Sequence, residues 1–235
     1  MNHGSRKQQF SAGLRAGLPI FIGYIPIGIA FAIMARQAGM SVGETCAMSL
    51  LVYAGASQMM AAGMVAQGAG IAAVVLATFV LNLRHLIMST CVMNRMEPTP
   101  LGLKLLGAFG VTDESFAVFT TDPKAIPTIW YFLGLSVSIY LSWNLGTLAG
   151  ALAMDFLPPL LTASLGIALY AMFISLLMPH LPGNGRLALL VLLTALCNTF
   201  LCRVMASSWA LIVSTLLCAF LGVFFVDLGA EGGDA

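Results

Sequence analysis

The chain has 235 residues, of which 60% are hydrophobic and only 8% are charged. About a quarter of the residues of a typical soluble domain are charged, so this composition excludes a large soluble domain. A membrane-spanning helix needs about 20 apolar residues, and the hydrophobic residues here suffice for about seven such helices. The net charge of +1 gives no electrostatic footprint for nucleic acid, which we do not expect as a partner. We therefore predict an integral membrane protein, with the lipid bilayer as its surroundings.

The N-terminal part predicts a short tail followed by a bent helix. Residues 1–15 are basic and are interpreted as a cytoplasmic tail, and the charge-free run 16–35 follows as the first span. Proline removes a backbone donor and kinks a helix, and in lipid the freed carbonyl groups must find partners in neighbouring helices or a cavity. We therefore interpret Pro19, Tyr24 and Pro26 as the kink of a moving gate.

The charge-free run 45–83 is too long for one span and is divided by the turn sequence AQGAG at 66–70. Its first half carries the polar, glycine-containing sequence YAGASQ, residues 53–58, at its centre. This half is either one helix with a polar face or two half-helices that break at Gly55. A break exposes backbone N–H groups that can hold a substrate carboxylate, whereas small residues in membrane helices also serve as packing faces. The candidate substrate-binding residues here are Tyr53, Gly55, Ser57 and Gln58.

The helix predicted over 70–93 contains the polar sequence NLRH within an apolar run. An arginine inside the membrane costs several kcal/mol unless it is paired or reaches the interface. Arg84 either reaches the interface, with His85 as a satisfied core residue, or lines a transport pathway. We favour the pathway, with Asn82 as a further substrate-binding residue.

The sequence TDES at 112–115 interrupts a weaker span predicted over 105–121. Its adjacent carboxylates, Asp113 and Glu114, point about 100° apart on a helix, so one partner meets only one of them. Such a carboxylate can pair with Arg84, bind a substrate ammonium group or carry a proton. The alternative is that the segment lies at the interface and both acids are solvated.

The remaining apolar runs are 126–154, 156–179, 187–202 and 207–226, and they precede an acidic tail at 227–235. We predict an all-α polytopic membrane protein with one transmembrane domain over 16–226. The distribution of Lys and Arg fits best with about seven spans, a broken or re-entrant segment at 45–66, and a cytoplasmic N-terminus. Asn144 and Asn198 are weaker site candidates.

An internal repeat of three-segment units is also indicated. Residues 17–32 resemble 134–150, and 76–89 resemble 192–207, which aligns Asn82 with Asn198. The repeats would cover 16–95 and 132–208, joined by 96–131. Internal repeats are the common architecture of secondary transporters.

The motifs of several enzyme classes are absent from the sequence. It contains neither a Walker A motif nor HExxH, and the five cysteines form no CxxC pair. Ser57 has only His85 as an obvious base for a serine protease. We expect no enzyme, no metal site and no other cofactor.

Four sequence segments, taken in order, resemble the AzlC family, the large subunits of bacterial branched-chain amino-acid exporters. They are GLRAGLPIFIGYIPIGIAFAIMA, YAGASQMMAAG, LNLRHLIMS and VTDESFAV, and the resemblance extends over about residues 11–226. It implies a multi-pass protein of the bacterial inner membrane that exports valine, leucine, isoleucine and methionine by proton-driven secondary transport. It also implies a small AzlD-type membrane subunit of roughly a hundred residues as partner.

Our main hypothesis is alternating access around a site in the middle of the membrane. The segment 55–58 would bind the amino-acid carboxylate, and Asp113 or Glu114 would face the ammonium group or carry the coupling proton. Arg84 and His85 would line the pathway. The alternatives are a non-transporting structural subunit, which the polar residues within apolar runs argue against, and a passive small-solute channel.

Overall fold

The computed structural model describes residues 4–156, 158, 174, 177–178 and 181–225. In this part of the chain every regular element is a helix, as the composition predicts. The predicted span 156–179 and the acidic tail 227–235 fall largely or wholly outside the described residues. The helices are α1 (Arg6–Ala16), α2 (Leu18–Gln37), α3 (Val42–Leu51), α4 (Gly55–Ala66), α5 (Ile71–Arg95), α6 (Leu101–Phe109), α7 (Asp113–Thr121), α8 (Ile129–Ala153), the 3-10 turn η1 (Met154–Phe156), α10 (Gly185–Leu201) and α11 (Ser207–Phe225).

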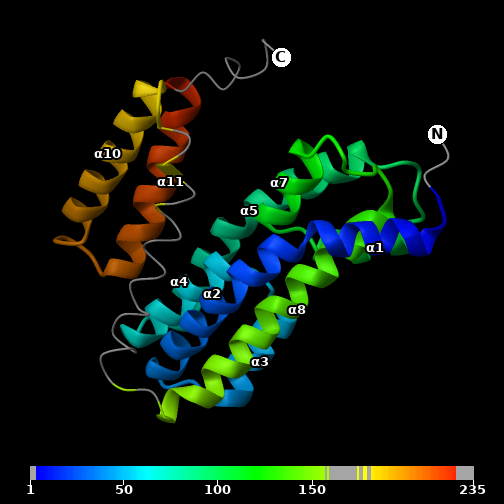
Figure 1. Cartoon of the computed structure of the whole chain (residues 1–235). Coiled ribbons are helices and arrows are strands. Elements are labelled where there is room, and N and C mark those ends of the chain that lie inside the picture. Colours follow the sequence, from blue (N-terminus) through cyan, green and yellow to red (C-terminus); the bar gives the residue numbers. More distant parts are fainter. Residues whose placement is uncertain (1–3, 157, 159–173, 175–176, 179–180, 226–235) are drawn as a thin grey trace.

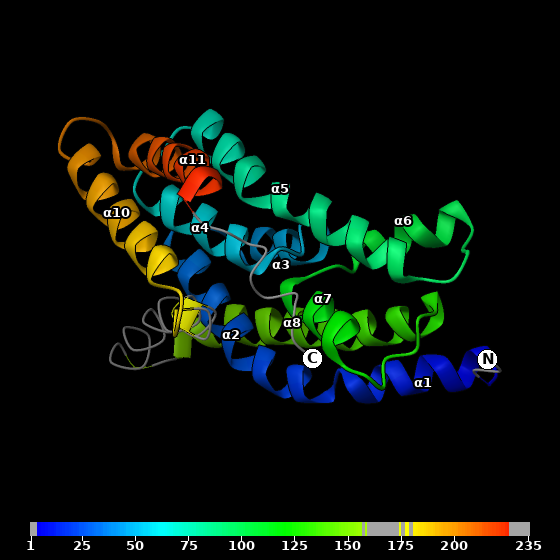
Figure 2. The same ribbon diagram turned by 90° about the horizontal axis from the view of Figure 1, so that it is seen from above.

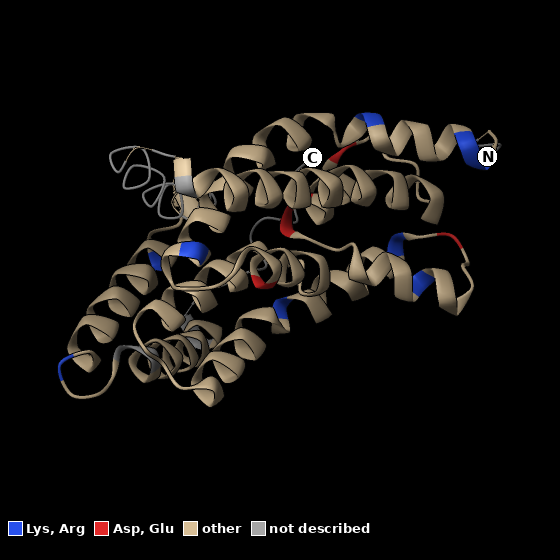
Figure 3. Ribbon diagram, turned by 90° about the horizontal axis from the view of Figure 1, so that it is seen from below, with Lys and Arg blue, Asp and Glu red and all other residues tan. Residues whose placement is uncertain are grey.

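Three helices of the described chain, α2, α5 and α8, are long and apolar enough to cross a membrane. Figure 1 shows α2 running beside α8, while α10 and α11 form a hairpin next to α4 and α5. The few charged residues are scattered, and several of them lie at helix ends and in loops (Figure 3). This arrangement is that of an all-α membrane protein.

Residues 6–15, which the sequence predicts as part of a tail, belong to helix α1. The hydroxyl of Ser5 accepts a hydrogen bond from the backbone N–H of Gln8, and the Gln8 side chain accepts one from the Ser5 backbone N–H. This capping box satisfies N–H groups that a helix start leaves unpaired. The helix then packs along α8, so the basic segment belongs to the bundle.

Glycines let α1 and α2 approach α8 at backbone contact. A Cβ atom on Gly13 would lie 1.9 Å from the carbonyl oxygen of Tyr131, and one on Gly146 would lie 2.6 Å from that of Ile25. Gly28 and Gly150 are equally confined by the facing backbone. Small residues at helix interfaces in membranes permit this close packing.

Two segments are broken in the middle. Residues 45–66, for which the sequence left two possibilities, form the half-helices α3 and α4, separated at 52–54. Residues 105–121, predicted as one weak span, instead form parts of α6 and α7, separated at 110–112. The second break arises because the Thr112 and Ser115 side chains form a capping box that starts a new helix.

The glycine packing of α2 on α8 predicts a stability difference between two variants of one helix. In Gly28→Leu the side chain would meet the α8 backbone, whose nearest atom lies 2.9 Å from the position of Cβ. We expect the free energy of unfolding to fall by about 1–3 kcal/mol, the usual cost of overpacking. Thermal unfolding of the detergent-solubilised protein measures it.

The control is Gly23→Leu, because a Cβ on Gly23 meets no atom of the described structure within 4 Å. This variant should unfold at the wild-type temperature or above it. Equal stability of the two variants would contradict close packing at Gly28.

Candidate functional site

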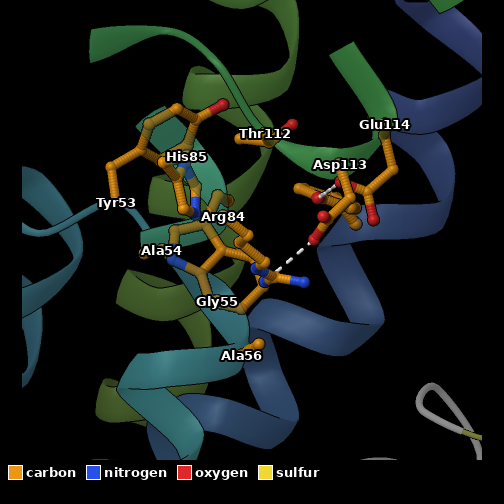
Figure 4. Close-up of a pocket in the computed structure, with 11 residues that line it drawn as sticks. Tyr53, Ala54, Gly55, Ala56, Arg84, His85, Thr112, Asp113 and Glu114 are labelled. Carbon is orange, nitrogen blue, oxygen red and sulfur yellow. Dashed lines mark hydrogen bonds and ion pairs between the residues drawn. The ribbon is translucent and has the colours of Figure 1, made fainter. Parts of the chain in front are cut away.

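Five segments of the chain meet around one polar cavity in the interior of the bundle: α2, the α3–α4 break, α5, the α6–α7 break and α8 (Figure 4). The free volume is about 20 Å³, room for about one water molecule. The residues that line it are Tyr24, Tyr53, Ala54, Gly55, Ala56, Arg84, His85, Thr112, Asp113, Glu114 and Trp143.

The α3–α4 break is held by buried side chains. The amide oxygen of Gln58 accepts a hydrogen bond from the Ala54 backbone N–H at 3.1 Å, and the Gln58 amide nitrogen donates to the Ser49 hydroxyl at 3.1 Å. The Ser57 hydroxyl donates to the Ala54 carbonyl oxygen at 2.9 Å. Tyr53 has a positive φ of 45°, a conformation uncommon for a bulky residue, which ends α3 abruptly.

The four residues predicted to bind substrate in this segment therefore divide into two pairs. Tyr53 and Gly55 line the cavity, whereas Ser57 and Gln58 are fully buried and bond the backbone of the break. Gly55 also provides space, because a Cβ there would lie 2.9 Å from the indole ring of Trp143. Gln58 and Ser57 thus hold the α3–α4 break in place.

The α6–α7 break places two carboxylates with different partners at the start of α7. The Asp113 carboxylate forms an ion pair of 2.9 Å with the Arg84 guanidinium group, and both side chains are about one-third exposed. The Glu114 carboxylate accepts a hydrogen bond from the hydroxyl of Tyr24. The sequence predicts, as one possibility, that an acid of this segment pairs with Arg84, and Asp113 does so. The two acids have different partners because adjacent residues of a helix point in different directions.

Buried polar atoms without a partner gather around the cavity. Among the described residues, the Tyr53 hydroxyl, the Arg84 Nε, the His85 Nε2 and the Trp143 Nε1 have no hydrogen-bond partner. Tyr53 and Trp143 are 3% and 2% exposed. The His85 Nδ1 donates to the carbonyl oxygen of Val111 at 3.1 Å, so its Nε2 is the free acceptor. Buried polar groups normally find partners, so these four atoms give the cavity polar groups that a water molecule or another polar molecule can bond.

The other predicted site residues lie outside this cavity. Pro19 and Pro26 are exposed on α2, although Tyr24 between them lines the cavity. Asn82 lies two residues before Arg84 and has a buried, unpaired side-chain oxygen. Asn144 donates to the backbone of its own helix, and Asn198 accepts from Ser214 on α11.

Trp143 is the lining residue that the sequence did not single out. Its ring packs edge-on against Tyr24, with ring centres 5.5 Å apart, and stacks on Phe31 at 5.8 Å. The only signal in the sequence is a tryptophan beside Ser142 and Asn144 in an apolar helix, where the polar Asn144 is the more obvious candidate. An aromatic residue in an apolar run does not by itself distinguish a core position from a site.

Broken helices that meet at a polar cavity inside a helical membrane bundle are typical of transporters. A family profile described as AzlC protein matches residues 19–157. The chain therefore belongs to the AzlC family, and its role is in membrane transport.

Individual relatives agree with the family profile. An uncharacterized membrane protein of Archaeoglobus fulgidus is 34% identical over 186 residues, which cover 78% of this chain and 81% of that protein. The inner membrane protein YgaZ of Escherichia coli is 31% identical over 224 residues, 92% of this chain and 91% of its own. The branched-chain amino acid transport protein AzlC of Bacillus subtilis is 26% identical over 156 residues, 64% and 61% of the two chains. No solved structure matches the chain.

The hydrogen bonds at the α3–α4 break predict coupling between two residues. Gln58→Leu leaves the Ala54 N–H unpaired and removes a donor to Ser49, so we expect a loss of roughly 1–3 kcal/mol of stability. Ser49→Ala should cost less stability in the Gln58→Leu background than in the wild type, because the shared hydrogen bond is already lost there and only the bond of Ser49 to Thr147 remains to be removed. Thermal unfolding of the two single variants and the double variant measures the coupling.

Gln67→Leu serves as the control, since Gln67 is exposed and bonds only within its own helix end. It should keep the wild-type unfolding temperature. Fully additive effects of the Ser49 and Gln58 variants would show that the bond does not hold the break.

Proposed function

We propose that this protein is a secondary exporter of branched-chain and related hydrophobic amino acids, namely valine, leucine, isoleucine and methionine, in the bacterial inner membrane. It is proton-driven and works with a small AzlD-type membrane subunit. The observation that supports this most is the cavity itself, where two helix N-termini, an arginine and two carboxylates converge. A zwitterion such as an amino acid needs partners for both of its charges. This cavity offers donors and a cation for the carboxylate, and carboxylates for the ammonium group.

The carboxylate of the substrate is recognised at the start of α4. Ala54, Gly55 and Ala56 line the cavity, and the N-cap residue Ala54 makes no side-chain hydrogen bond to the N–H groups of the first turn. Backbone N–H groups and the helix dipole make such an end favourable for an anion. Arg84 and the unpaired Tyr53 hydroxyl add further donors.

The ammonium group of the substrate is recognised at the start of α7. Asp113 and Glu114 both line the cavity, together with the rings of Tyr24 and Trp143. A substrate ammonium group there competes with Arg84 for Asp113, while the substrate carboxylate offers Arg84 a replacement partner. Binding thus replaces the Arg84–Asp113 ion pair by two others. Arg84 pairs with the substrate carboxylate and Asp113 with the substrate ammonium group, so no charge is left unpaired in the membrane.

Proton coupling is assigned to Glu114, with His85 as its companion. Glu114 meets the Tyr24 hydroxyl and no cation among the described residues, so protonation removes a charge without breaking an ion pair. The free Nε2 of His85 lies on the same cavity and can accept a proton. An ionisable residue inside a membrane bundle is often part of a proton pathway.

The small cavity corresponds to a closed conformation. A volume of about 20 Å³ holds a water molecule and not an amino acid, so transport requires that the walls separate. The contact between Tyr24 on α2 and Glu114 on α7 joins two of these walls. Protonation of Glu114 weakens this contact, and α2, which contains Pro26, is the moving gate.

Two neutral variants test the carboxylates. Asp113→Asn and Glu114→Gln should each lower valine transport at least tenfold, because one loses the ammonium partner and the other the transferable proton. Wild-type and variant proteins are reconstituted with the candidate small subunit, and uptake of labelled valine is measured in proteoliposomes under an imposed pH gradient. The variants should retain the wild-type unfolding temperature to within a few degrees.

The control is Asp122→Asn, because Asp122 lies at the other end of α7 and bonds only the Lys124 backbone N–H. This variant should transport like the wild type. Normal transport by both cavity variants would overturn the carboxylate roles, and flux of the wild type that an uncoupler leaves unchanged would indicate a passive channel.

A further inference from the structure

A second, apolar cavity lies between α4, α5 and α11, and its volume is about 220 Å³. We infer that it receives the hydrophobic side chain of the transported amino acid, so that it determines which side chains are accepted. This inference rests on the proposed function of the polar cavity. Its main walls are Met60 on α4, Ala77, Val80 and Leu81 on α5, and Leu211 and Ile212 on α11.

The helix register places the apolar cavity directly beside the polar one. Met60 lies four residues after Ala56 on α4, and Val80 lies four residues before Arg84 on α5. Residues four apart share one face of a helix, and four residues correspond to about 6 Å along its axis. The two cavities therefore follow the same α4–α5 interface, one helical turn apart. This separation suits an amino acid, whose charged groups and side-chain end are a few ångströms apart.

The size and lining of the second cavity fit a branched or thioether side chain. An apolar cavity of about 150 Å³ is large enough for benzene, so about 220 Å³ accommodates a leucine or methionine side chain. Thr215 is the one polar residue among those that line it, and the Arg84, Asp113 and Glu114 side chains belong to the other cavity. A charged side chain would therefore meet no partner there, and the site rejects it.

One wall of the apolar cavity comes from a part of the chain that the family profile does not cover. Ile212 on α11 is buried and packs with Ala77 and Ala73 of α5, which closes the cavity on that side. The polar cavity is built entirely within residues 19–157, the range that the profile matches. The zwitterion site and the side-chain site thus share α4 and α5, but only the side-chain site also uses α11, so the choice of side chain depends on α11.

The test is a change in side-chain selectivity. Ala77 is 4% exposed, so Ala77→Leu fills the cavity, whereas Ala72→Leu adds the same atoms to an exposed position of the same helix. Transport of labelled leucine, methionine and valine is measured in proteoliposomes that contain the full chain and its small partner. Ala77→Leu should lower the leucine-to-valine and methionine-to-valine transport ratios at least fivefold, and Ala72→Leu should leave both ratios at the wild-type value.

A second variant keeps the test decisive if Ala77→Leu does not fold. Leu211→Ala enlarges the cavity from the α11 side and should admit phenylalanine. The measurement is the phenylalanine concentration that halves the transport of labelled leucine, which should be at least fivefold lower for this variant than for the wild type. If wild-type protein transports leucine but neither variant changes these selectivities, the inference is wrong and the proposed function stands. An equal loss for all substrates would show that the cavity affects transport without selecting the side chain and would also overturn the inference. If wild-type protein transports none of these amino acids, the proposed function fails, and the inference fails with it.

Discussion

The structure depends on one constraint, the need of every backbone polar group inside a membrane for a hydrogen-bond partner. Two helices of this protein are interrupted at 52–54 and 110–112, and such interruptions are tolerated only where protein or water replaces the lost bonds. At the first break Gln58 and Ser57 supply those bonds, and at the second Thr112 and Ser115 do so. Both breaks need a polar surrounding formed by protein, and both face the same cavity. The candidate site therefore lies where the backbone groups of the two breaks find their partners.

Helix α8 is the platform against which the broken helices are arranged. Its glycines allow α1 and α2 to approach at backbone contact, and these contacts fix Tyr24 beside Trp143. The Ser49 hydroxyl links the network of the first break to Thr147 of α8 at 2.8 Å. Figure 2 shows α2 and α8 on one side of the molecule and α4 and α5 on the other, with the interior between them. The platform and the breaks together hold these polar groups inside the helix bundle.

The polar cavity and the apolar cavity lie at different positions along the same α4–α5 interface. The start of α4 and Arg84 of α5 contribute to the polar cavity, and the following turn of α4 and the preceding turn of α5 contribute to the apolar one. A zwitterion with a hydrophobic side chain has the same division within a few ångströms. This correspondence connects the proposed transport function to the inferred role of α11, because α11 closes only the apolar part.

The amino-acid sequence by itself determined the membrane class, the helical fold and most of the polar cavity. With so few charged residues, a polar residue inside an apolar run is conspicuous, and this pattern predicts Arg84, His85, Asp113 and Glu114, which all line the cavity. Only the tertiary structure decided that Gln58 supports the break instead of lining the cavity, that residues 6–16 form a packed helix, and that Trp143 belongs to the site. Those three outcomes depend on which backbone groups and side chains meet across helices distant in sequence, and hydropathy along the chain carries no information about such contacts.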